Sequence, residues 1–165
     1  MQFLKTQRLL LRNLLPADAK MMHAYRNDPA CSRYQRWDDT SLEAVRALID
    51  THREDCFPSE KAEQRFALCL HSGQLIGELA FFFNPEDHCV TLGITVAPEF
   101  QRRGYAREIL CAVVNATREA FSVMDIVALI DRDNTASIRL FESLGFVQEC
   151  YAESIASYVY VIYAK

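Results

Sequence analysis

The chain has no hydrophobic stretch long enough to cross a membrane and little glycine or proline. Its 165 residues include five glycines and five prolines, too few for a low-complexity or mostly disordered chain. No apolar run approaches about 18 residues, so we expect no transmembrane helix and no membrane partner. The first residues, MQFLKTQRLLLRNLLP, lack the apolar core and small-residue cleavage site of a signal peptide. A cytoplasmic location is therefore expected.

Paired metal-ligand motifs are also missing. The six cysteines are scattered without a CxxC pair, which is typical of reduced thiols rather than of a disulfide framework. The four histidines form no HxxxH or HExxH motif, and His88 beside Cys89 is the only close pair. Adjacent residues on a strand point to opposite faces. We therefore predict that the protein binds no metal.

The charge balance is mildly acidic. Eighteen Lys and Arg residues stand against 22 Asp and Glu residues, which gives a formal net charge of −4. Such a balance argues against general affinity for nucleic acid or anionic lipid. Hydrophobic residues make up 50% of the chain, which is enough for one core. We expect a single domain over residues 1–165.

The first half of the chain predicts helices followed by an antiparallel meander. A strand is expected over 8–13, and a helix begins near Pro16 and ends before Asp28. A capping box of Thr40 and Glu43 predicts a second helix as far as about residue 55. Alternating apolar residues then predict strands over 65–71, 74–83 and 89–96.

The second half completes a mixed sheet. A 3.6-residue apolar stripe predicts a helix over about 104–122, and a short buried strand follows over 125–130. Asn134 is expected to cap another helix, which Gly145 ends. Two closing strands cover 146–153 and 154–163. Together these elements predict an α/β (α+β) fold with a mixed, mostly antiparallel sheet of about seven strands and about four flanking helices.

The segment TLGITVAPEFQRRGYAREIL gathers positive charge at a helix start. Arg102, Arg103 and Arg107 lie there, beside backbone N–H groups that lack helical partners and at the positive end of the helix dipole. Gly104 allows close approach of a ligand. The phosphate motifs GxxxxGK[ST] and GxGxxG are absent. The segment predicts a phosphate-like anion site, with a solvated arginine cluster as the alternative.

The same segment resembles a known cofactor loop. VAPEFQRRGYA is similar to the QxxGxG/A pyrophosphate loop of the GCN5-related N-acetyltransferases, and DRDNTASIRLFESLGF is similar to the second half of their acetyl-CoA site. Three further segments, RLLLRNLLPADA, YRNDPACSRYQRWDDTSLEAV and GQLIGELAFF, resemble the subgroup that contains the ribosomal-protein N-terminal acetyltransferases. The resemblance covers nearly the whole chain. It implies the fold of that family and transfer of an acetyl group from acetyl-CoA to an amine.

The resemblance also implies a set of cofactor contacts. The diphosphate of CoA would lie on backbone N–H groups after Gln101, in the loop that includes Tyr105, namely those of Arg102, Arg103, Gly104, Ala106 and Arg107. The pantetheine arm would pair with Ile94, Thr95 and Val96, where a backbone N–H would polarise the thioester carbonyl. Asn134 matches the family asparagine that contacts the cofactor or an ordered water, a role compatible with helix capping.

The implied reaction is direct attack of a neutral amine on the thioester, with CoA thiolate leaving. Many family members have a glutamate where this chain has Thr91, and a tyrosine acid where it has Phe141. In the subgroup a serine of the NTASIR segment is proposed as the acid, and Ser137 occupies that position. A plain helix-surface hydroxyl is the alternative for Ser137. Two glutamates remain as substitute bases or ordinary surface carboxylates, Glu78 and Glu153.

The presence of Thr91 in place of a glutamate base affects which amine can serve as the acceptor. Deprotonating a lysine amine at pH 7 costs roughly 4.6 kcal/mol, whereas an α-amine costs roughly 1.4 kcal/mol. An α-amine, either a protein N-terminus or a small metabolite, is therefore favoured. A polyamine or antibiotic acetyltransferase and a catalytically weak CoA-binding module remain as alternatives.

The acceptor is expected at the loop Ser32 to Asp39. Four of its residues are candidates for substrate contact, namely Arg33, Tyr34, Arg36 and Trp37. The arginines would suit an acceptor with a carboxylate or acidic neighbours. Packing of Trp37 beneath the loop is the alternative for that residue. Both a monomer and a homodimer are compatible with the sequence.

Overall fold

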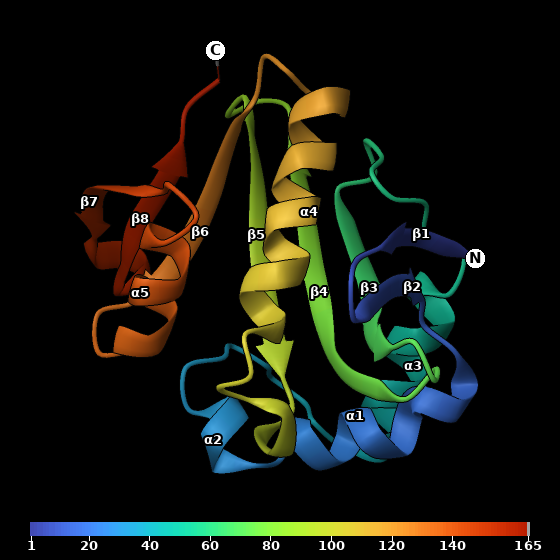
Figure 1. The fold of residues 1–165 in the computed structure, drawn as a ribbon. Coiled ribbons are helices and arrows are strands. Elements are labelled where there is room, and N and C mark those ends of the chain that lie inside the picture. The colour runs from blue at the N-terminus through green and yellow to red at the C-terminus, as the bar shows by residue number, and fades with distance from the viewer. Residues whose placement is uncertain (165) are drawn as a thin grey trace.

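The computed structural model describes residues 1–164, which form one eight-stranded sheet with five α-helices (Figure 1). The strands lie in the order β1-β2-β3-β4-β5-β6-β8-β7. The strands are β1 (Gln2–Lys5), β2 (Leu9–Asn13), β3 (Glu63–Leu70), β4 (Leu75–Asn84), β5 (Cys89–Val96), β6 (Asp125–Asp131), β7 (Val147–Ala152) and β8 (Ser157–Ile162). The helices are α1 (Ala19–Arg26), α2 (Pro29–Ser32), α3 (Leu42–His52), α4 (Tyr105–Ala120) and α5 (Thr135–Glu142).

The predicted mixed, mostly antiparallel sheet is confirmed, with one strand more than expected. Every neighbouring pair is antiparallel except β5 and β6, which are parallel. The additional strand is β1, a four-residue edge strand that pairs with β2 and buries no residue fully. The additional helix is α2, a single turn within the segment expected to be a loop.

The predicted cap of α3 is wrong by one residue. Ser41 is the N-cap, and its Oγ accepts a hydrogen bond from the Ala44 N–H at 3.1 Å. The Thr40 hydroxyl instead donates to Asn27 Oδ1 at 2.8 Å, which joins the loop before α3 to the end of α1. The hydroxyl of Thr40 is thus occupied by a distant residue, and the next serine caps the helix.

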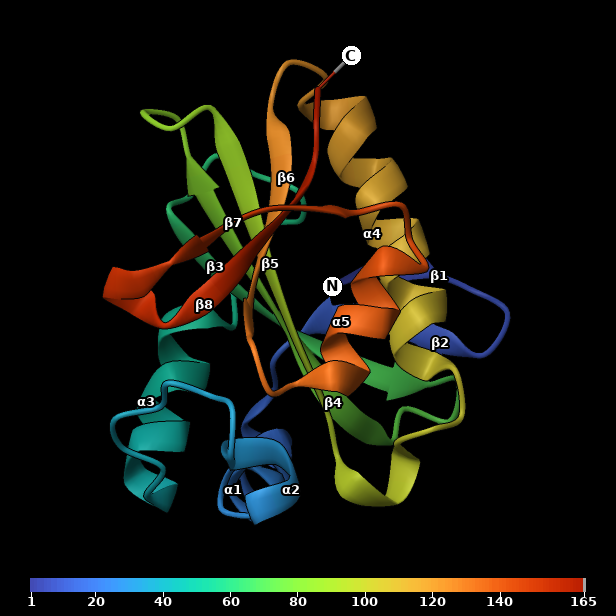
Figure 2. The same ribbon diagram turned by 90° about the vertical axis from the view of Figure 1, so that its left-hand side faces the viewer.

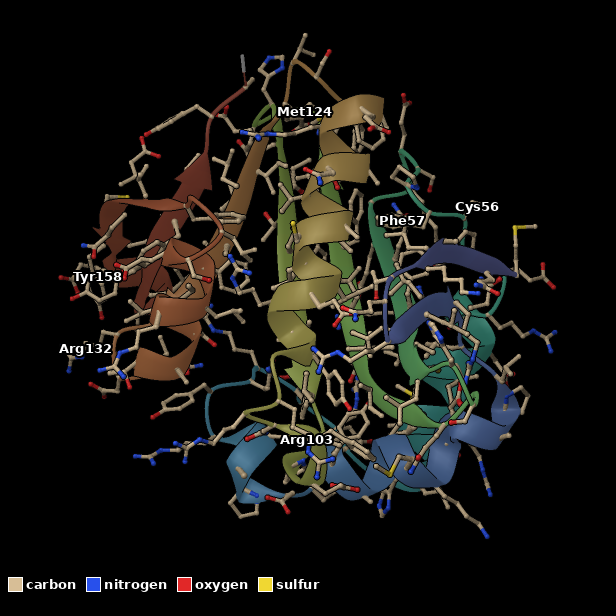
Figure 3. All side chains as sticks on the ribbon, viewed as in Figure 1. Cys56, Phe57, Arg103, Met124, Arg132 and Tyr158 are labelled. Atoms are coloured by element: carbon tan, nitrogen blue, oxygen red, sulfur yellow. The ribbon has the colours of Figure 1, made fainter. Side chains whose placement is uncertain are left out.

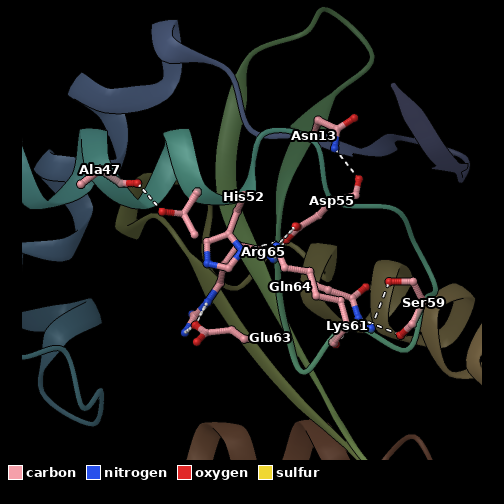
Figure 4. A network of polar contacts seen from close by, with 10 residues as sticks. Asn13, Ala47, His52, Asp55, Ser59, Lys61, Glu63, Gln64 and Arg65 are labelled. Carbon is pink, nitrogen blue, oxygen red and sulfur yellow. Dashed lines mark hydrogen bonds and ion pairs between the residues drawn. The ribbon is translucent and has the colours of Figure 1, made fainter.

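The end of α3 is fixed by a buried carboxylate (Figure 4). Asp55 Oδ2 lies 2.8 Å from His52 Nδ1 and accepts from the Arg65 backbone N–H at 3.0 Å. Asn13 donates to the Asp55 carbonyl at 2.6 Å, and Lys61 pairs with the other carboxylate oxygen. The helix therefore ends at His52, short of the expected residue 55, because this segment is held against β2 and β3.

Helices cover both faces of the sheet (Figures 1 and 2). α4 and α5 lie on one side, and α1, α2 and α3 lie on the other. α4 buries one face, formed by Ile109, Leu110, Val113, Val114 and Thr117. This stripe follows the 3.6-residue period that predicted the helix. No helix within residues 1–164 is long and apolar enough to cross a membrane.

The sheet opens between its two parallel strands. β5 and β6 pair from Cys89 with Asp125 to Thr91 with Val127. Beyond Thr91, β5 continues to Val96 while β6 leaves it to pair along its length with β8. The edge of β5 from residue 92 onward therefore faces the gap and has no pairing with β6.

Candidate functional site

A cavity of about 420 Å³ lies at the gap between β5 and β6, within the range typical of small-molecule sites. Its walls come from the end of β5, the loop and first turn of α4, the start of α5, and α2 with the residues that follow it. It brings together most of the predicted cofactor residues, namely Ile94, Thr95, Val96, Gln101, Arg102, Gly104, Tyr105, Ala106, Arg107 and Asn134. Ser137 and Tyr34 line it as well.

The start of α4 has the backbone geometry of an anion site. Gly104 is its N-cap in a left-handed conformation, with φ +79°, and Arg102 is left-handed too, with φ +61°. Left-handed residues next to a helix start turn successive N–H groups toward one concavity. The N–H groups of the first turn have no partner within the helix and point to its positive end.

Arg103 does not line the cavity. Its guanidinium carbon lies 5.6 Å from the centroid of the Phe100 ring, beside the loop before α4 (Figure 3). The expected role of Arg103 involved its backbone N–H, and that prediction does not depend on the side chain.

The loop before α4 is fastened to the end of β5. Gln101 Nε2 donates to the Val96 carbonyl at 2.9 Å, and the Cys31 thiol donates to the same oxygen at 3.3 Å. Cys31 lines the cavity. Burial raises the pKa of its thiol to about 11, so the thiol is protonated at neutral pH and serves as a donor. Sequence reasoning missed Cys31 because its role depends on contact with β5.

The start of α5 places a cap and a free hydroxyl at the cavity. Asn134 Oδ1 accepts from the Ser137 N–H at 3.2 Å, as the predicted cap requires. Among residues 1–164, the Ser137 side chain has no hydrogen-bond partner, so its hydroxyl is free to face a ligand. Phe141 is 4% exposed and packs against Phe146 with ring centroids 5.0 Å apart. The position of the usual family tyrosine is thus a core position here.

The predicted acceptor loop crosses the gap and contacts several elements in turn. The Tyr34 hydroxyl donates to the Asp133 carbonyl at 3.2 Å, and Gln35 Nε2 donates to Thr95 Oγ1 at 3.1 Å. Gln35 lines the cavity and was not among the predicted residues, although it lies between two of them. The structure therefore brings two residues of this loop to the cavity.

The other three predicted acceptor residues lie outside the cavity lining. Arg36 donates to Ser157 Oγ at 2.9 Å and to the Ile155 carbonyl, which connects the loop to the turn between β7 and β8. The guanidinium of Arg33 lies 5.2 Å from the Tyr34 ring centroid. The Trp37 ring lies 4.6 Å from the Arg26 guanidinium carbon, which favours the packing alternative for Trp37.

Glu78 is not the surface carboxylate that its sequence context allowed. It is 2% exposed on β4, opposite Thr95 on β5, and its two oxygens accept from Arg26 at 2.8 Å and 2.7 Å. Both oxygens of this carboxylate are thus occupied by the guanidinium of Arg26. Glu153, the other candidate base, is exposed at the β7–β8 turn.

Histidine, cysteine and carboxylate side chains do not gather into groups of three or more that could hold a metal ion in residues 1–164.

Comparisons with known proteins agree with this geometry. A family model described as an acetyltransferase (GNAT) domain matches residues 8–147. An uncharacterized N-acetyltransferase of Bacillus subtilis, YoaA, is 30% identical over 149 residues, covering 88% of this chain and 83% of the relative.

Two solved structures share the fold. An acetyltransferase (GNAT family) from Bacillus anthracis has a TM-score of 0.81 at 22% identity and covers 99% of this chain and 98% of its own. Spermidine N-acetyltransferase from Vibrio cholerae, solved in complex with CoA and spermine, has a TM-score of 0.75 at 23% identity and covers 93% and 92%.

Proposed function

The chain belongs to the GNAT family of N-acetyltransferases, and we propose that it acetylates an α-amine, either a protein N-terminus or a small metabolite, from acetyl-CoA. The observation that carries the proposal is the single cavity wall that joins the edge of β5, the start of α4 and the start of α5. That wall offers a strand edge, an anion site and a hydroxyl to one elongated ligand.

Acetyl-CoA fits this wall by its chemistry. Its diphosphate would accept hydrogen bonds from backbone N–H groups in the loop before α4 and in the first turn of α4, namely those of Arg102, Arg103, Gly104, Ala106 and Arg107. Its pantetheine amides would pair with the edge of β5 over Ile94 to Val96, beyond the last pairing with β6. A backbone N–H of that edge would stabilise the negative charge that develops on the thioester oxygen.

The reaction needs two proton movements. The neutral amine attacks the thioester carbonyl carbon, a C–N bond forms, the C–S bond breaks, and CoA leaves as a thiolate. One proton leaves the amine for solvent, and one reaches the sulfur. We assign the second transfer to Ser137, whose hydroxyl is unpartnered among residues 1–164 and lies in the cavity wall.

The lack of a residue placed to take the amine proton favours an α-amine as the acceptor. Thr91 stands where the gap between β5 and β6 opens and cannot take a proton, and Glu78 is occupied by Arg26. An acceptor that is partly neutral at pH 7 avoids the need for a strong base. Deprotonation at pH 7 costs roughly 1.4 kcal/mol for an α-amine and roughly 4.6 kcal/mol for a lysine side chain.

A polyamine acceptor is the second candidate. A spermidine N(1)-acetyltransferase of Vibrio cholerae is 25% identical over 142 residues, covering 86% of this chain and 80% of the relative. A polycation would be attracted by free carboxylates, and the residues that line the cavity in the described part of the chain include no Asp or Glu. This lining favours the α-amine over the polyamine.

The test is release of CoA thiol from acetyl-CoA with three matched acceptors. One is a lysine-free peptide with a free N-terminus, one is an N-terminally blocked peptide with one lysine, and one is spermidine. We expect turnover with the first alone. Faster turnover with spermidine would establish the second candidate, and CoA binding without release on any acceptor would indicate a binding module.

A further inference from the structure

The turn between β1 and β2 reaches the first turn of α4 and holds Glu108. The Thr6 hydroxyl donates to Glu108 Oε1 at 2.6 Å, and the Arg8 backbone N–H donates to the same oxygen at 2.8 Å. Arg8 Nε donates to Oε2 at 2.6 Å. Both carboxylate oxygens are therefore engaged by a segment about one hundred residues away in the chain.

The far end of the Arg8 side chain contacts the anion loop itself. Its Nη1 donates to the Arg103 carbonyl at 3.0 Å, and its guanidinium carbon lies 4.6 Å from the Tyr105 ring centroid. Between those residues, a Cβ added to Gly104 would lie 3.5 Å from Arg8 Nη2. Arg8 thus contacts the loop on both sides of its left-handed glycine.

Hydrogen bonds to both of its oxygens distinguish Glu108 from the carboxylate of an ordinary surface ion pair. The side chain of Glu108 is 16% exposed and that of Arg8 is 43% exposed. Burial by itself would raise the pKa of Glu108, but the hydrogen bonds from Thr6 and Arg8 outweigh burial and lower it. The carboxylate is therefore ionised at neutral pH and its charge-assisted bonds are formed.

The loop needs such support because its backbone is unusual. Arg102 is a left-handed non-glycine residue, a conformation that persists when the surrounding structure fixes it. An anion binds more tightly when the N–H groups that receive it are already oriented, since the cost of ordering them has been met. A contact that holds residues 103 to 105 and the first turn of α4 orders those N–H groups.

We propose that Arg8 and Glu108 are positioning residues for the diphosphate of acetyl-CoA, through a clamp formed by Thr6, Arg8 and Glu108 on the start of α4. The inference rests on the proposed function for the identity of the anion. The clamp lies on the α4 side of the loop and is no part of the acceptor loop. Loss of the clamp should therefore weaken binding of the cofactor and leave binding of the acceptor unchanged.

The experiment measures CoA binding by titration calorimetry for the wild type, Arg8→Met and Glu108→Gln. We expect each variant to raise the Kd for CoA about tenfold, as expected for loss of charge-assisted hydrogen bonds. In turnover assays the KM for acetyl-CoA should rise by a similar factor. The KM for the acceptor, and kcat at saturating acetyl-CoA, should stay within twofold.

The matched control is Arg12→Met. Arg12 lies on β2, four residues after Arg8, and pairs with Asp18 at 2.7 Å rather than with Glu108. This control should lose stability without a change in the Kd for CoA. Arg8→Lys should fall between the wild type and Arg8→Met, because an ammonium keeps the charge but cannot hold Glu108 and the Arg103 carbonyl together.

Two results would overturn the clamp. One is an unchanged Kd for CoA in both Arg8→Met and Glu108→Gln, and the other is an equal rise in Arg12→Met. The proposed function fails separately, when the wild type binds CoA but acetylates no α-amine while the clamp variants still bind CoA more weakly.

Discussion

The stability of the protein should depend strongly on the buried ion pair between Arg26 and Glu78. Arg26 is 4% exposed and Glu78 is 2% exposed, and two hydrogen bonds join them. Removing one partner of such a pair leaves a buried charge without compensation, at a cost of about 3–5 kcal/mol. We therefore expect Glu78→Gln and Arg26→Met each to lower the free energy of unfolding by about that amount.

The double variant separates charge from packing. Arg26→Met with Glu78→Leu removes both charges and keeps apolar volume, so the free energy of unfolding should recover to within about 1 kcal/mol of the wild type. The two changes are in contact and should be strongly non-additive. The control is Arg65→Met, because Arg65 pairs with the half-exposed Glu63 and should cost less than about 1 kcal/mol.

The assay is urea unfolding followed by tryptophan fluorescence and far-ultraviolet circular dichroism. The chain has one tryptophan, Trp37, which lies against Arg26, so its emission reports on this place alone. In Arg26→Met the native emission should shift and acrylamide should quench it more strongly. Single variants that lose less than about 1 kcal/mol, or a double variant as unstable as the sum of the two, would show that the buried charges of Arg26 and Glu78 do not depend on each other.

Three further predictions concern β4 behind the cavity and two residues of the cavity wall. Gly77→Ala should lower the free energy of unfolding, measured in urea, by about 3 kcal/mol or more, because the added Cβ would lie 2.1 Å from the Thr95 carbonyl oxygen. A decrease of less than about 1 kcal/mol would contradict the close approach of β4 and β5. Ser137→Ala should lower kcat about a hundredfold with the Kd for CoA unchanged, and an unchanged kcat would make Ser137 a helix-surface hydroxyl. At pH 8, iodoacetamide should alkylate Cys31 far more slowly than the exposed thiols of Cys56, Cys111 and Cys150. Burial raises the pKa of Cys31 to about 11, so its reactive thiolate form grows only as the pH approaches that value. Equal alkylation rates by mass spectrometry would contradict this.

Features that depend on local sequence were predictable. The cap at Asn134 and the apolar stripe of α4 follow from neighbouring residues in the chain, and the structure contains both of them. The same holds for the succession of strands along the chain from β3 to β8, since alternation and turn residues mark them, although their spatial order, with β8 between β6 and β7, was not predicted. The glycine and arginines of the anion loop could be found for the same reason.

Features that depend on distant partners were not predictable. Arg26 and Glu78 are 52 residues apart, and neither position shows from its neighbours that it is buried with an opposite charge. Arg8 and Glu108 are 100 residues apart, so the clamp on α4 has no local signal. β1 was missed for a related reason, because its main support is pairing with β2 rather than burial of its own side chains.

The preference for an α-amine is tested by mass-spectrometric mapping of the acetyl group on a peptide with one free N-terminus and one lysine. The peptide is incubated at pH 7 with the protein and acetyl-CoA, beside a sample without protein. We expect one added acetyl group on the α-nitrogen and an unmodified lysine. Acetylation of the lysine at an equal or greater rate would contradict this preference.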